Sequence, residues 1–257
     1  MPTKKQQITL FILLLLLLTA CSDNNTPTPT STTNDTTNTT NNPQATQTLT
    51  AQPATANATP PPVTLNPSHG ATIGYTYEAF LSPQQEPAEE SDTPALAPEV
   101  FLSTAPSVDR NSRPSLGHGL IRVTNDLSTA YIDLQIENVN PQDIVMFHIH
   151  CGRPDILGPI LVDFALTEDL QAQFTDGYFS ATVTHEDITL TSANGHGIVG
   201  AFTAGCPIIA GVPGDVKTIA GLNFIAQKGE LYFNLHTAGQ TFYGEMRGQL
   251  YPVPNTP

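Results

Sequence analysis

Two histidines that lie one residue apart carry the clearest chemical signal in this chain. His148 and His150 occur in the segment Phe147-His148-Ile149-His150-Cys151-Gly152, which follows an apolar run. Side chains on a strand alternate between its two faces, so an extended segment would project both imidazoles from one face and point Phe147 and Ile149 into a core. Two parallel imidazoles on a rigid strand supply half of a metal site.

A second segment supplies a candidate third ligand, His236. Apolar residues alternate with polar ones over residues 231–236, so the side chain of His236 shares a face with Tyr232 and Asn234, away from the core. If this strand neighbours the first, the three imidazoles converge on one point. Three histidine nitrogens with an open position suit copper or zinc, and the lack of a thiolate or carboxylate among them favours copper. The alternative is that the histidines are structural and hydrogen-bond to loop backbone.

Histidines that bind a metal usually hydrogen-bond through their other ring nitrogen. Asn234, Glu245 and Arg247 are the candidates for this supporting role, because they lie close to the histidine segments in the sequence. A simpler interpretation of Glu245 and Arg247 is an ion pair that supports the last hairpin. The sequence contains no paired-carboxylate motif, serine nucleophile elbow, phosphate-binding loop or dinucleotide fingerprint.

The N-terminus has the features of an export signal. In residues 1–20, Lys4 and Lys5 precede an apolar run that is short for a membrane span, and small residues follow it. The ending resembles the lipobox of bacterial lipoproteins, in which Cys21 is lipidated and becomes the first mature residue. We therefore expect an exported, membrane-anchored protein, and Ser22 indicates the outer membrane if the source is Gram-negative. The alternatives are an ordinary cleaved signal with a coincidental cysteine, or a transmembrane anchor.

Export determines how the other two cysteines are interpreted. If Cys21 carries the lipid, Cys151 and Cys206 form an even pair in an oxidising compartment, which favours a disulfide. The bridge would close a loop of roughly 55 residues and stabilise the domain by about 4 kcal/mol in the chain-entropy model. The alternative is two free thiols, or a thiolate metal ligand at Cys151.

Composition divides the rest of the chain into a linker, a domain and a tail. Residues 21–72 are rich in Thr, Asn and Pro and have too few large apolar residues to form a core, so we expect a disordered linker. Residues 73–251 form one domain, and residues 252–257 a flexible tail. Within the domain, a Pro- and acid-rich stretch near 82–114 and a Gly-rich stretch near 186–217 break the strand pattern and are expected to be insertions.

The charge balance narrows the class of partner. The chain carries a net charge of −14, with 9 Lys and Arg against 23 Asp and Glu. Such acidity argues against binding to nucleic acid or to anionic lipid headgroups, whereas it is compatible with binding a cation.

The domain has a strand-like pattern almost throughout. Short apolar–polar alternations are separated by Gly, Pro, Asn and Asp, which predicts an all-β fold built as a β-sandwich. A single short helix is predicted over 167–173. Strands are predicted at 119–123, 131–137, 147–151, 158–164, 177–184, 221–226, 231–236 and 244–251.

Four segments, in this order, resemble the CHRD domain, a family named from chordin and common in bacterial exported proteins. They are the histidine segment 147–152 and the segments 158–162, 231–237 and 244–250, which read GPILV, LYFNLHT and GEMRGQL. The resemblance extends over about residues 74–251 and implies an immunoglobulin-like, Greek-key β-sandwich. The two insertions are longer than the family usually shows. As an analogy only, the His-x-His strand is similar to the copper-binding one of Cu/Zn superoxide dismutase, which is also a β-sandwich.

Three functional hypotheses follow from these features. We favour a lipid-anchored extracytoplasmic binding or interaction module that holds copper, or less favourably zinc, through His148, His150 and His236, with an unknown protein or small-molecule partner. The second hypothesis is a copper-dependent redox enzyme of the superoxide dismutase type. The third is a structural envelope or adhesion domain without metal.

Overall fold

The computed structural model describes residues 61–65, 70–194 and 216–254. The predicted signal peptide, the lipidation site Cys21, most of the linker and Cys206 lie outside these ranges, and what was predicted of them stays a prediction. Among the helices in the described ranges, none has both the length and the apolar character that crossing a membrane requires.

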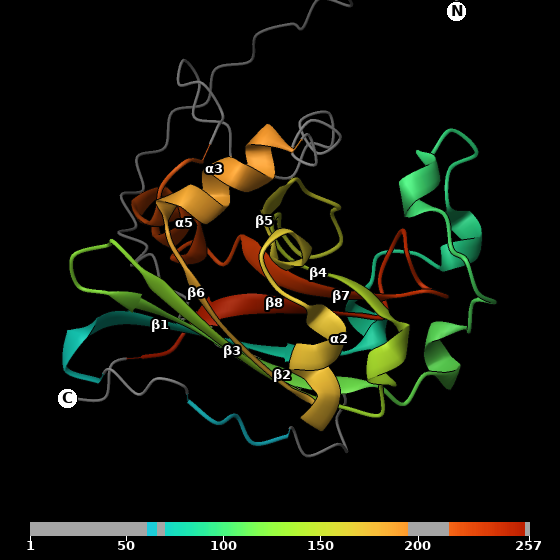
Figure 1. The fold of residues 1–257 in the computed structure, drawn as a ribbon, viewed down its shortest axis with the longest axis horizontal. Coiled ribbons are helices and arrows are strands. Elements are labelled where there is room, and N and C mark those ends of the chain that lie inside the picture. Colours follow the sequence, from blue (N-terminus) through green and yellow to red (C-terminus); the bar gives the residue numbers. More distant parts are fainter. Residues whose placement is uncertain (1–60, 66–69, 195–215, 255–257) are drawn as a thin grey trace, which may run out of the picture. The chain divides into compact units, whose positions relative to one another are not determined.

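The described residues form an eight-stranded antiparallel sheet in the order β5-β4-β7-β8-β1-β2-β3-β6. This confirms the all-β prediction (Figure 1). The strands are β1 (Ile73–Leu81), β2 (Leu116–Thr124), β3 (Ala130–Glu137), β4 (Ile144–Cys151), β5 (Ile160–Asp163), β6 (Tyr178–Val183), β7 (Leu231–Thr237) and β8 (Met246–Pro252).

The sheet curls so that its two halves face each other across one core. Strands β4 and β6 lie near opposite ends of the strand order, yet the ring centroids of Phe147 and Phe179 are 5.1 Å apart. Gly119 of β2 lies so close to β7 that an added Cβ would come within 2.8 Å of the Phe233 ring. These contacts make the two halves the layers of a sandwich, which confirms the predicted architecture.

Within the described ranges, three α-helices lie in the connections: α2 (Leu170–Gln173), α3 (His185–Ala193) and α5 (Ile219–Ala226). The prediction of a strand over 221–226 is wrong, because these residues belong to α5. Thr218 caps this helix by accepting a hydrogen bond from the Gly221 N–H, and the apolar residues at three-residue spacing are buried. A short apolar run fits both a buried strand and a buried helix, so its periodicity alone could not decide. The N-termini of α3 and α5 meet where His185 Nδ1 accepts the Ile219 N–H at 3.1 Å (Figure 1).

The segment between β1 and β2 is built from single turns of 3-10 helix. These are η2 (Pro83–Gln85), η3 (Glu90–Asp92), η4 (Glu99–Phe101) and η5 (Arg110–Ser112); further turns lie at η1 (Gly70–Thr72), η6 (Pro141–Asp143), η7 (Phe164–Leu166) and η8 (Phe174–Asp176). The segment packs against the loop between β7 and β8. Thr104 and Ala105 donate their N–H groups to Ala238 O, and Gln240 Nε2 donates to Val108 O at 2.8 Å.

Candidate metal centre

The pairing of β4 with β7 places the three predicted histidines on one face of the sheet. The strands are antiparallel neighbours, with His148 opposite Asn234 and Met146 opposite His236. Phe147, Ile149 and Leu235 point into the core and are fully buried. The strand phase predicted for both segments is therefore confirmed, and the histidines lie on the face turned away from the core.

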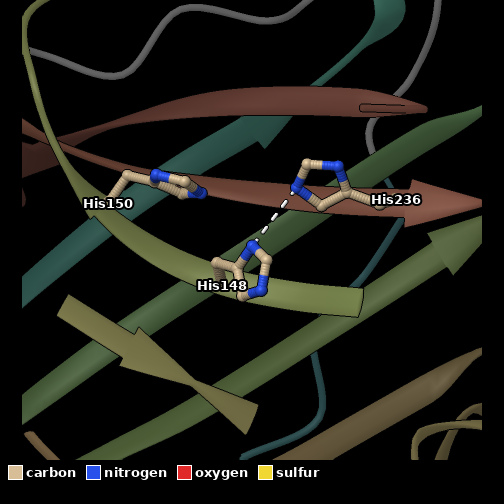
Figure 2. Close-up of side chains that lie close together, drawn as sticks. All are labelled: His148, His150 and His236. Atoms are coloured by element: carbon tan, nitrogen blue, oxygen red, sulfur yellow. Dashed lines mark hydrogen bonds between the residues drawn. The ribbon is translucent and has the colours of Figure 1, made fainter. Parts of the chain in front are cut away.

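The three rings turn toward one another (Figure 2). One ring nitrogen of each of His148, His150 and His236 lies within 4.8 Å of the other two. The His148 Nδ1–His236 Nε2 distance is 3.2 Å, marked by the dashed line in Figure 2. The side of the sheet that carries them is covered, because the three residues are only 1%, 7% and 4% exposed.

Backbone carbonyls fix the tautomers of two of the rings. His150 Nδ1 lies 2.9 Å from Gly158 O, and His236 Nδ1 lies 3.0 Å from Thr241 O. A carbonyl oxygen can only accept, so both Nδ1 atoms carry the hydrogen, and in the neutral rings each Nε2 atom carries a lone pair. These two Nε2 atoms are therefore able to donate a lone pair to a metal ion.

His148 lies between His236 and an acidic residue, Asp163. Because His236 Nε2 carries no hydrogen, His148 Nδ1 donates to it in the pair at 3.2 Å. The other nitrogen, Nε2, lies 3.5 Å from Asp163 Oδ1 on β5, the residue paired with His148 in register. Among the described residues, His148 Nε2 and His150 Nε2 are buried nitrogens without a hydrogen-bond partner.

Burial disfavours the charged form of two of the three histidines. It lowers the pKa of His150 and of His236 well below the ordinary value for histidine, and the neighbouring His148 lowers both further. Neutral imidazoles are the form that binds a metal ion, so metal binding does not require these two rings to lose a proton near neutral pH.

Tyr232 and Arg247 support the ring of His150. The Tyr232 ring stacks on His150 with centroids 4.7 Å apart and planes at 5°, and its hydroxyl accepts the Gly158 N–H at 3.0 Å. The Arg247 guanidinium carbon lies 3.5 Å from the centre of the same tyrosine ring, and Arg247 donates to the carbonyls of Arg153 and Ile156. Arg247 thus reaches the histidines through Tyr232.

The other two predicted supporting residues bind elsewhere. Asn234 Nδ2 donates to Tyr243 O at 2.8 Å, and Glu245 accepts hydrogen bonds from Ser115 and Thr237. The groups that face the outer ring nitrogens are instead two backbone carbonyls and Asp163. Sequence reasoning missed these because a carbonyl has no residue signature and Asp163 lies on a third strand whose pairing was unknown.

Cys151 lies on the opposite face from the histidines. It is fully buried in the hydrophobic core at the end of β4, so it does not point at the three rings. Its predicted partner Cys206 lies outside the described residues, and the disulfide stays a prediction.

The donor set fits a copper or zinc ion once the rings rotate toward it. Ligand nitrogens at about 2.0–2.1 Å from one tetrahedral ion lie about 3.4 Å apart. The nitrogens here lie within 4.8 Å of one another, so ring rotation must bring the most distant pair closer by up to about 1.4 Å. Three imidazole nitrogens, of which His150 Nε2 is buried without a hydrogen-bond partner, are the ligand type that such an ion takes.

Comparison with known proteins identifies the family of the domain. The model of the CHRD domain matches residues 99–250, which is more than half of the chain and includes all three histidines. No curated protein and no solved structure matches the chain. The chain belongs to the CHRD domain family.

Proposed function

We propose that this protein is an exported CHRD-domain binding module that holds one copper ion between His148, His150 and His236. The observation that carries the proposal is the convergence of three buried imidazoles on one point, with the outer nitrogens of two already bonded to backbone carbonyls. A merely structural histidine needs no such convergence. Zinc would bind the same nitrogens, and copper is preferred because the set has no carboxylate or thiolate.

Each ligand has a defined atom for the ion. His150 and His236 would bind through Nε2, and His148 through Nδ1, the atom that faces His236. Binding at His148 Nδ1 displaces its hydrogen, and the neutral ring then carries a hydrogen on Nε2, beside Asp163 Oδ1. All three rings then have an acceptor behind them, the arrangement that orients histidine ligands and raises their basicity.

Burial favours a binding role over turnover at the metal. A superoxide dismutase-type reaction needs an open coordination position that an anion can reach, whereas the three ligands are covered and the chain is strongly acidic. The remaining alternative, a structural envelope or adhesion domain, requires no metal at all.

The location that we propose is that of an exported, membrane-anchored lipoprotein, at the outer membrane or the periplasm or cell surface if the source is Gram-negative, with the lipid on Cys21 and the linker as a tether. The support for this is the charged, apolar and small-residue order of the N-terminus. Growing the source cells with a radioactive fatty acid tests it: the full chain should be labelled and the Cys21→Ser variant should not. Equal labelling of both would contradict lipidation at this residue.

The metal proposal is tested on the domain purified without the first 21 residues. After loading with Cu(II) or Zn(II) and desalting, elemental analysis should find about one ion per chain. A His148→Ala/His150→Ala variant should retain none, whereas His118→Ala, whose ring pairs with Glu78 on β1, should bind like the unchanged domain. Absence of retained metal in the unchanged domain, or equal retention by the double variant, would refute the site.

Superoxide turnover separates the binding module from the enzyme. The copper-loaded domain should turn over superoxide no faster than an equal amount of copper bound to the free amino acid histidine. Rapid turnover that disappears in the double variant would favour the redox enzyme instead.

A further inference from the structure

The segment between β1 and β2 reaches the histidines through one acidic residue, Glu90. Its carboxylate is buried and accepts hydrogen bonds from three successive backbone N–H groups, those of Thr241, Phe242 and Tyr243, at 3.0–3.2 Å. The hydroxyl of Ser103 donates a further bond at 2.5 Å. Successive N–H groups that converge in this way form an anion-binding nest.

The nest shares a peptide unit with the candidate metal centre. The carbonyl of Thr241 and the N–H of Phe242 belong to the same planar peptide group. The N–H end donates to Glu90 at 3.0 Å, and the carbonyl end accepts the Nδ1–H of His236 at 3.0 Å. A continuous chain of two hydrogen bonds therefore runs from the carboxylate, through one peptide group, to the imidazole.

This chain has a chemical consequence for His236. A negative charge on the N–H end polarises the peptide group and makes its carbonyl a stronger acceptor, because hydrogen bonds in series strengthen one another. A stronger acceptor at Nδ1–H makes Nε2 more basic and holds the ring in one orientation, as a carboxylate does when it contacts a ligating histidine directly.

We propose that Glu90 is a positioning residue for the metal centre, which sets the orientation and donor strength of His236 across the Thr241–Phe242 peptide. The inference rests on the proposed function for its effect on metal affinity. Its effect on the ring itself exists in the metal-free protein and is measurable there.

The first measurement uses the metal-free domain. In Glu90→Gln the amide still accepts one or two of the three N–H groups but loses the charge. The Nδ1–H proton of His236, observed by ¹⁵N-edited NMR, should move upfield and exchange faster with water. Glu89→Gln is the matched control, because Glu89 lies in the same segment and binds Arg110, and no hydrogen bond joins its side chain to residues 238–244 within the described part of the chain.

The second measurement is the Cu(II) dissociation constant of the same variants. Glu90→Gln should weaken binding about tenfold, the lower end of the range for supporting residues of metal ligands, and Glu89→Gln should not change it. Glu90→Asp keeps the charge on a shorter side chain, so it should fall between the two. If Glu90→Gln does not fold, the dissociation constant of Glu90→Asp still tests the role of Glu90.

The outcomes separate the two proposals. An unchanged His236 signal in Glu90→Gln, or an equal change in Glu89→Gln, would overturn the role of Glu90 whatever the metal does. If the unchanged domain binds no metal while the His236 signal responds as expected, the proposed function fails and the coupling between Glu90 and His236 stands.

Discussion

The ring of Tyr232 lies flat on the ring of His150, with the centroids 4.7 Å apart and the planes 5° from parallel. The two residues are register partners on β7 and β4, so the sheet itself sets this stack. Arg247 covers the other face of the tyrosine, at 3.5 Å from its centre. An imidazole that is held in this way could present only one edge to an ion bound between the three histidines.

Removing the stack should weaken the site more than removing the hydroxyl. Tyr232→Phe keeps the ring but leaves the half-buried Gly158 N–H without its acceptor, so the free energy of unfolding should fall by about 1 kcal/mol with little change in copper affinity. Tyr232→Leu should also weaken copper binding several-fold. Urea denaturation and copper titration of both variants check this. Equal affinities in the two variants would show that the stack does not position His150.

Substitution of Asp163 should lower the affinity for copper more than it lowers the stability of the fold. Its carboxylate lies 3.5 Å from His148 Nε2 and also caps η7 by accepting the Ala165 N–H. Asparagine caps a helix as well as aspartate does, so Asp163→Asn should change the free energy of unfolding by less than about 1 kcal/mol. Copper affinity should fall 10- to 100-fold, because the outer nitrogen of a ligating histidine loses its charged acceptor.

The matched control for that variant is Asp126→Asn, a turn residue that binds Ser128 and Thr124 away from the site. It should leave copper affinity unchanged. A loss of affinity in the control, or no loss in Asp163→Asn, would contradict the role of Asp163.

Glu86 gives the metal-free domain a distinct dependence on pH. Burial raises the pKa of this glutamate to about 8, although Arg247 and Arg113 act to lower it. Between the ordinary pKa of 4.5 and about 8, the folded state holds a proton that the unfolded state has lost. The free energy of unfolding therefore falls as the pH rises through this window, by up to about 1.4 kcal/mol per pH unit.

The variant Glu86→Gln isolates this effect. Glutamine has the same shape and no titration, so the difference in stability between the variant and the unchanged domain should grow in favour of the variant from pH 5 to pH 8 and then level off. Denaturation at pH 5, 6, 7, 8 and 9 measures that difference. A difference that is constant across this range would show that Glu86 is ionised in the folded state.

The strand phases of the site were predictable, whereas the groups behind the ligands were not. Alternation with period two placed His148, His150 and His236 on the face opposite Phe147, and the pairing of β4 with β7 then brought them together. The carbonyls of Gly158 and Thr241 come from loops, where sequence specifies no orientation. Helix α5 was mistaken for a strand because its apolar run is short and fits both structures.

The measurement that tests the central claim most directly is an anomalous difference map at the copper edge, from crystals of the domain soaked in Cu(II). We predict one strong peak per chain, bounded by His148 Nδ1, His150 Nε2 and His236 Nε2, each about 2.0–2.1 Å from the ion. A map without a peak between these three rings, in crystals that bind copper elsewhere or not at all, would contradict the account.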